Sequence, residues 1–137
     1  MLSIFSNIVE FRNGESDLHV LHIRMITEML CRYLSERTKQ FPLSQKEISA
    51  ITTASSLHDI GKIAIAEEIL NKPGKLTEEE FEIMKTHAAI GAAMIENLKQ
   101  YRGEPLIKLA HDICRWHHER WDGKGYPDGL KGNEIPI

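Results

Sequence analysis

Helix-start signals recur along this chain and leave little room for strands. Ser44 and Thr77 are each followed three residues later by a glutamate, and then by apolar residues at helical spacing. Such a pair is typical of a capping box, in which two side chains satisfy free N–H groups at the start of a helix. We therefore predict one helix from Ser44 to about Ile60, stopped by Gly61, and another from Thr77 to about residue 98.

Two more segments carry the helical pattern. Apolar residues recur every three or four positions in residues 17–41, before Pro42, and a further helix is predicted over residues 105–121, with Pro105 in its first turn. A short helix precedes a turn at Pro73, and the glycine-rich residues 122–137 are predicted to form a long loop. The predicted fold class is all-α: a helical bundle that ends in a glycine-rich loop.

Length and charge restrict the function classes. The 137 residues predict one domain, and a net charge of −3 argues against duplex nucleic-acid binding through a basic surface. A small anionic substrate remains compatible if a metal or a local lysine supplies positive charge. No apolar run approaches the ~20 residues that span a bilayer, and the N-terminus lacks signal-peptide features, so a cytoplasmic protein is expected. Cys31 and Cys114 are predicted to be packed thiols of a reducing compartment.

The stretch SLHDIGKIAI, residues 56–65, places His58 beside Asp59 between apolar flanks. A buried His-Asp pair is costly unless something binds it, and we expect a metal ion. On a helix the two side chains diverge. Both reach one ion only near a helix end, where Gly61 lets the backbone turn; alternatively, Asp59 bridges two ions. Lys62 is placed to contact a phosphate or to protonate a leaving group, although a solvated lysine also fits its position.

Further imidazoles fall on predicted helices. His87 is surrounded by small residues that would let another helix approach, and His117 and His118 are adjacent near the end of a helix. Imidazole suits zinc, iron, copper and nickel, and bundles build metal sites from inward-pointing side chains of several helices. Considered alone, His87 also fits a buried core position. The pair formed by His117 and His118 also fits an exposed helix end.

Glu15 and His19 are four residues apart and share one face of a helix. They are candidates for metal ligands from the N-terminal helix, although the same spacing fits a surface ion pair. Asp17 and His22 are competing candidates nearby, without a partner at the same spacing.

Three stretches together resemble one family. HDIGK resembles the signature of the HD superfamily of metal-dependent phosphohydrolases, HHERWDGKGYP is similar to the second signature of its HD-GYP branch, and KPGKLTEEEFEIMKTHAAIG to the segment joining them. The resemblance extends from about Glu15 onward. It implies a helical domain with two divalent ions, iron or manganese, with magnesium, nickel or zinc as alternatives. It also implies hydrolysis of the bacterial second messenger cyclic di-GMP to a linear dinucleotide or GMP.

The resemblance assigns roles by position. The implied metal ligands are Glu15, His19, His58, Asp59, His87, His117 and His118. Asp59 is implied to bridge the ions, Lys62 to lie near the scissile phosphate, and these two residues to be catalytic. The loop formed by Gly125, Tyr126 and Pro127 is implied to shape the pocket and to contact signalling-protein partners.

The family pattern continues beyond Ile137 with a helix that supplies a last aspartate ligand and another that adds basic residues. We expect residues 1–137, a single HD-GYP-like domain without those helices, to show low or no activity. We also expect an exposed apolar surface that favours a homodimer or a domain-exchanged dimer. Two alternatives stay open: a degenerate module that binds nucleotides or proteins without cleavage, and an HD phosphohydrolase acting on another nucleotide.

Overall fold

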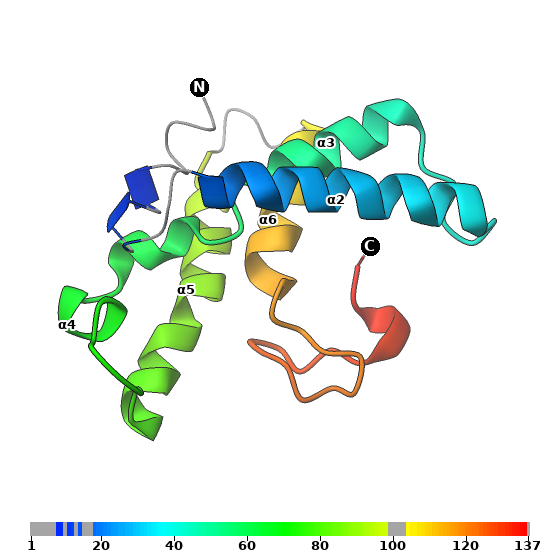
Figure 1. Ribbon diagram of the computed structural model, residues 1–137. Helices are drawn as coiled ribbons and strands as arrows, with labels where there is room; N and C mark the ends of the chain where they lie inside the picture. Colours follow the sequence, from blue (N-terminus) through cyan, green and yellow to red (C-terminus); the bar gives the residue numbers. More distant parts are fainter. Residues whose placement is uncertain (1–7, 10, 13, 15–17, 99–103, 137) are drawn as a thin grey trace.

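The chain folds into α-helices joined by short turns (Figure 1). The computed structural model describes residues 8, 9, 11, 12, 14, 18–98 and 104–136. Its elements are α2 (Leu18–Arg37), α3 (Gln45–Ser55), the 3₁₀ helix η1 (Ile60–Ala64), α4 (Glu67–Leu70), α5 (Glu78–Glu96), α6 (Pro105–Trp116) and the 3₁₀ helix η3 (Gly132–Glu134). Strand pairing among these residues is limited to one isolated bridge, between Asp122 and Lys131. The prediction of an all-α fold is confirmed.

Both predicted capping boxes are present. The Ser44 hydroxyl accepts from the Glu47 backbone N–H at 3.3 Å, and the Glu47 carboxylate accepts from the Ser44 N–H at 2.8 Å. At the start of α5, Thr77 and Glu80 make the same two bonds at 3.2 and 2.7 Å. The two sequence patterns therefore fix where α3 and α5 begin.

The prediction that α3 runs to Ile60 is wrong, because the helix ends at Ser55. The hydroxyls of Ser55 and Ser56 donate to the carbonyls of Thr52 and Thr53, at 2.9 and 2.7 Å. Such bonds compete with the helical pattern of the main chain. Residues 56–59 form a turn that leads into η1, so His58 and Asp59 lie between two helices.

The prediction that Gly61 stops a helix is also wrong, because Gly61 lies inside η1. A Cβ atom at this position would lie 2.0 Å from the His87 carbonyl oxygen and 2.6 Å from the Gly91 nitrogen. No side chain fits in that space. Glycine is needed here because η1 packs directly on the backbone of α5, and this contact brings Asp59 toward His87.

The other predicted helices form with shorter ends. α2 ends at Arg37 rather than residue 41, and α6 ends at Trp116 rather than residue 121. The short helix before Pro73 is α4. The loop predicted over residues 122–137 therefore begins earlier, at residue 117, and η3 is its one helical element among the described residues 117–136.

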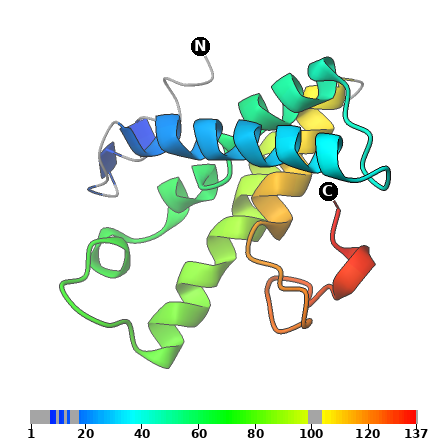
Figure 2. The ribbon, with the colours of Figure 1, turned by 45° about the vertical axis from the view of Figure 1, so that its right-hand side comes forward.

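The core forms where α3, α5 and α6 meet (Figure 2). Side chains of α5 pack on α6 and η1, and those of α3 pack on α2 and α6. The buried cluster is small-residue rich: Ala54, Leu57, Ala92, Ile95, Ala110 and Cys114. Small side chains let the helix axes approach closely, so functional residues on separate helices can meet.

Cys31 and Cys114 are both free and buried, as predicted. The Cys114 thiol donates to the Leu57 carbonyl at 3.1 Å, and burial raises the pKa of the Cys114 thiol to about 12. This thiol is therefore a packing group rather than a nucleophile.

The helix α2 exposes much of its apolar face. Leu21, Met25, Met29 and Tyr33 are all exposed, and Met29 keeps 68% of its surface. These exposed side chains agree with the apolar surface that we expected from the sequence. That a second copy of the chain covers this surface stays a prediction. None of the helices described is both long enough and apolar enough to cross a membrane.

Candidate metal centre

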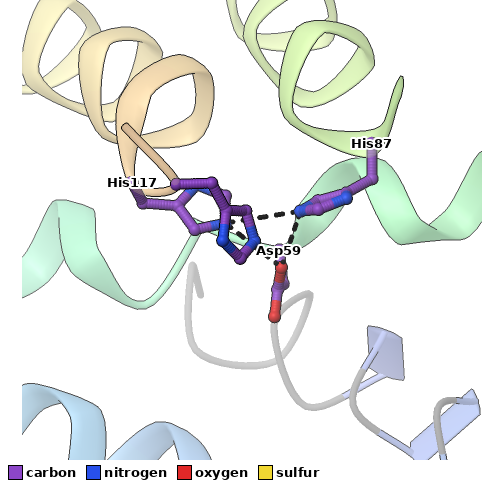
Figure 3. A group of neighbouring side chains, drawn as sticks. Asp59, His87 and His117 are labelled. Carbon is purple, nitrogen blue, oxygen red and sulfur yellow. Dashed lines mark hydrogen bonds and ion pairs between the residues drawn. The ribbon is translucent and has the colours of Figure 1, made fainter. Parts of the chain in front are cut away.

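The Asp59 carboxylate is the centre of a cluster of imidazoles (Figure 3). Asp59 Oδ2 lies 3.1 Å from Nε2 of His58. Asp59 Oδ1 lies 3.2 Å from Nε2 of His87 and 3.6 Å from Nε2 of His117. These histidines come from the turn after α3, the middle of α5 and the end of α6. The fold thus brings together residues that are up to 59 positions apart in the sequence.

Each of these three rings is held by its other nitrogen. Nδ1 faces a main-chain carbonyl oxygen three or four residues earlier: Ser55 for His58 at 3.0 Å, Met84 for His87 at 2.7 Å, and Ile113 and Cys114 for His117 at 3.1 Å each. A carbonyl oxygen only accepts, so Nδ1 carries the proton and donates. In the neutral ring Nε2 then carries a lone pair directed at Asp59.

This arrangement places acceptor atoms against one another. Nε2 of His87 and Nε2 of His117 are only 3.3 Å apart. Asp59 Oδ1 is buried and has no well-aligned hydrogen bond among the described residues. Such lone pairs repel unless a cation or a proton lies between them, so the donor set fits a bound metal ion.

His118 completes a group of four residues that could hold a metal. Its ligand atom and those of Asp59, His87 and His117 all lie within 4.8 Å of one another. Burial, followed by the neighbouring imidazoles, lowers the pKa of His118 to about 4. The ring is therefore neutral at neutral pH, and a nitrogen lone pair is available to a metal.

The Asp59 carboxyl is held in its charged form. Burial acts to raise the pKa of Asp59, but the imidazoles of His117, His58 and His87 outweigh this effect when they carry a proton on Nε2, and they hold the pKa of Asp59 below its usual range. The carboxyl group is therefore an anionic ligand at neutral pH.

Lys62 contacts the opposite oxygen of the same carboxylate. Its Nζ lies 2.8 Å from Asp59 Oδ2, and the Lys62 side chain is largely buried. The two oxygens of Asp59 thus face different partners, with His87 and His117 on one side and His58 and Lys62 on the other.

The N-terminal candidates are only partly placed. The His19 ring centroid lies 6.1 Å from that of His58, so α2 brings His19 to the margin of the cluster. Glu15 and Asp17 lie outside the described residues. His22 is exposed on α2 and does not belong to the group of four.

The predicted loop residues contact the cluster through Tyr126. Its ring stacks on His118 with centroids 4.6 Å apart and planes tilted by 24°. Burial raises the pKa of Tyr126 to about 12. A Cβ at Gly125 would lie 2.5 Å from the carbonyl oxygen of His118, so only glycine lets the loop come this close. Pro127 follows at the exposed edge.

Sequence reasoning missed the contacts that hold this loop. The Glu119 carboxylate accepts three main-chain N–H bonds, from Asp128, Gly129 and Leu130, at 2.8, 3.1 and 2.9 Å. The Asp128 carboxylate accepts from Arg115 and Trp116. No local pattern reveals partners 9 to 13 residues apart in a loop.

Sequence reasoning also missed Arg12. Its guanidinium donates to the carbonyls of Lys62, Ile63 and Ile65 at 3.1, 2.6 and 2.8 Å. These bonds satisfy carbonyls at the C-terminal end of η1. They tie a segment far away in the sequence to the element that carries Lys62.

Replacing Glu119 with glutamine is expected to loosen the loop. One carboxylate oxygen becomes an N–H₂ group that cannot accept, so at least one loop N–H loses its partner, at a cost of about 1–2 kcal/mol. Urea unfolding and hydrogen exchange at residues 128–130 measure the effect. Glu134→Gln is the matched control, because Glu134 caps only the Lys131 N–H. Equal effects of the two substitutions would contradict the prediction.

Comparison with known proteins finds relatives over nearly the whole chain. A "Probable cyclic di-GMP phosphodiesterase" of Vibrio cholerae is 40% identical over 135 residues, which cover 96% of this chain and 31% of that protein. A "Cyclic di-GMP phosphodiesterase" of Thermotoga maritima is 39% identical over all of this chain and 34% of its own length. A "3'3'-cGAMP-specific phosphodiesterase 2" of Vibrio cholerae is 39% identical over 96% of this chain and 23% of its own length.

The chain spans about a quarter to a third of the length of these curated relatives. A family profile described as "HD domain" matches residues 6–137. The match includes the adjacent His58 and Asp59 and every imidazole of the cluster. The chain therefore belongs to the HD domain family.

Proposed function

We propose that this chain is a metal-dependent phosphodiesterase that hydrolyses cyclic di-GMP to the linear dinucleotide or to GMP. The observation that carries the proposal is the convergence of three imidazole Nε2 atoms on the Asp59 carboxylate, with Lys62 beside it. The names of the Vibrio and Thermotoga relatives support the choice of substrate.

The proposed ligands form two sets. His87, His117 and His118 would hold one divalent ion, His58 and His19 would contribute to a second, and Asp59 would be shared between them. Imidazole and carboxylate together suit iron or manganese, with nickel, zinc or magnesium as alternatives. Divalent ions in such a site neutralise phosphate charge and bring the pKa of water near neutrality.

Lys62 supplies a proton and a positive charge. Hydrolysis joins a water oxygen to phosphorus and breaks one P–O bond to ribose, and the departing ribose oxygen needs a proton. The Lys62 ammonium group, held at Asp59 Oδ2, is placed to donate that proton and to recover one from water. The fixed Nδ1 bonds keep the imidazoles oriented during this step.

A second candidate substrate is a mixed guanine–adenine cyclic dinucleotide. It is favoured by the third relative, whose printed name specifies 3'3'-cGAMP and whose identity to this chain is 39%. Both substrates have two phosphodiester bonds in a ring, so the same metal centre serves either one.

The test compares metal-stripped and metal-loaded protein. Stripped protein should not cleave cyclic di-GMP, and manganese or ferrous iron under anaerobic conditions should restore cleavage, at the low rate expected of residues 1–137. Metal at 100 times its Kd should add about 2.7 kcal/mol to the free energy of unfolding, measured as a rise in Tm. His87→Ala should lose both effects, while the exposed His22→Ala should keep them. Absence of bound metal together with no turnover would contradict the proposal.

A further inference from the structure

A depression with aromatic and cationic walls adjoins the imidazole cluster. It has a volume of about 470 Å³ and lies between α5 and the loop after α6. Its lining includes His117 and His118 of the cluster together with Phe81, Lys85 and Tyr126. This volume is in the ~300–1,000 Å³ range of small-molecule sites. We refer to Phe81, Lys85 and Tyr126 as the aromatic wall.

The aromatic wall is built from residues that already contact one another. The Phe81 and Tyr126 rings meet edge to face with centroids 6.3 Å apart. Lys85 Nζ lies 5.5 Å from the Phe81 centroid and 5.8 Å from that of Tyr126. Phe81 nevertheless keeps 46% of its surface exposed. Part of the Phe81 side chain is therefore accessible to a ligand beside the cluster.

The charge of the depression differs from that of the whole chain. Lys85, Arg120 and Lys124 line the depression together with one carboxylate, Glu119, which is engaged by three loop N–H groups. Lys85 and Arg120 are paired with exposed carboxylates outside this lining, Glu82 at 2.6 Å and Asp122 at 2.7 Å. Exposed ion pairs of this kind contribute little free energy, so both cations are available to an anionic ligand.

We infer that the aromatic wall binds one nucleobase of the dinucleotide whose phosphate lies at the imidazole cluster. The base stacks on Phe81, and Lys85 donates to acceptor atoms on the base edge. Guanine offers two such acceptors, O6 and N7, whereas adenine offers a donor in place of O6. Lys85 therefore favours guanine. This inference rests on the proposed function, because it names a contact with the same substrate.

The main test is Phe81→Ala, with Ile83→Ala as its matched control. Both residues lie on α5 and both are 46% exposed, but Ile83 does not line the depression. Loss of base stacking should raise the KM for cyclic di-GMP about tenfold and leave kcat within about twofold. Phe81→Trp should restore the wild-type KM. Ile83→Ala should behave as wild type.

Binding without turnover tests the same contact independently. Phe81→Ala should raise the Kd for GMP about tenfold by calorimetry and leave that for ribose 5-phosphate, which has no base, unchanged. Lys85→Met should reduce the preference for cyclic di-GMP over 3'3'-cGAMP. Circular dichroism and Tm confirm that each variant is folded.

The outcomes separate this inference from the proposed function. If the wild type cleaves cyclic di-GMP and Phe81→Ala matches Ile83→Ala, the inference falls and the proposed function stands. If the wild type cleaves no dinucleotide but binds GMP in a Phe81-dependent way, the inference stands and the proposed reaction falls. If GMP and ribose 5-phosphate bind equally, or neither binds, the inference falls.

Discussion

Asp59→Asn is expected to lower hydrolysis of cyclic di-GMP by about 10³-fold or more. The neutral amide removes the only carboxylate in the group of four ligand residues. Changing a group that only supports a metal ligand lowers metal affinity or activity about 10–100-fold, so loss of the proposed anionic ligand itself should lower activity more. Initial rates at saturating manganese, together with metal content per chain, measure the effect.

Measurements of stability distinguish a variant that has lost catalysis from a variant that has lost its fold. In metal-free protein, the asparagine N–H₂ can donate to an Nε2 lone pair that the carboxylate only repels. The metal-free variant should therefore be at least as stable as metal-free wild type, and metal should no longer raise its Tm. Substantial turnover by folded Asp59→Asn would contradict the proposed role of the carboxylate.

Asp112→Asn is a matched control. Asp112 also contacts a histidine and a lysine, with His111 Nδ1 at 3.0 Å and Lys108 Nζ at 2.9 Å. It lies on α6 but outside the group of four. Its substitution removes a comparable charge and should leave turnover and metal content unchanged.

Gly61→Ala is expected to give the largest loss of stability of the substitutions considered. The new Cβ would lie 2.0 Å from the His87 carbonyl oxygen, and main-chain atoms on both sides cannot move independently. Separating η1 from α5 should cost about 3 kcal/mol, at the upper end of overpacking effects. It should also weaken metal binding, because Asp59 and His87 lie on the two sides of this contact.

Gly91→Ala tests the same contact from the α5 side. There the added Cβ would lie 3.2 Å from the Gly61 nitrogen, which is tight but short of a collision. The gain of about 1 kcal/mol in helix propensity offsets part of that crowding, so the net change should be small. Urea unfolding of both variants gives the comparison, and equal destabilisation would contradict the packing argument.

Much of the fold could be predicted because its signals are local. The capping boxes at Ser44 and Thr77 need only residues three positions apart, and the structure has both. The end of α3 was missed because Ser55 and Ser56 leave no such pattern. Their hydroxyls compete with the helix only once the backbone is in place.

The residues of the candidate site could be named from the sequence, but the contacts that hold them in place could not be predicted from it. His58, Asp59, His87, His117 and His118 lie close together in the structure, and their roles as metal ligands stay a prediction. The resemblance to a family, rather than spacing, identified this set, because each histidine alone also fits a structural role. The bonds from residues 128–130 to the Glu119 carboxylate and the exposure of Phe81 depend on contacts between distant segments, which a single sequence does not reveal.

The Nδ1 bonds of His58, His87 and His117 have a consequence for ion selectivity. Each ring is anchored by a main-chain carbonyl three or four residues earlier, so its free nitrogen has little freedom to move. A set of ligands held in this way is rigid before an ion binds. It should discriminate between metal ions by ionic radius and preferred coordination angles, because the ligands cannot rearrange to fit whichever ion is most abundant.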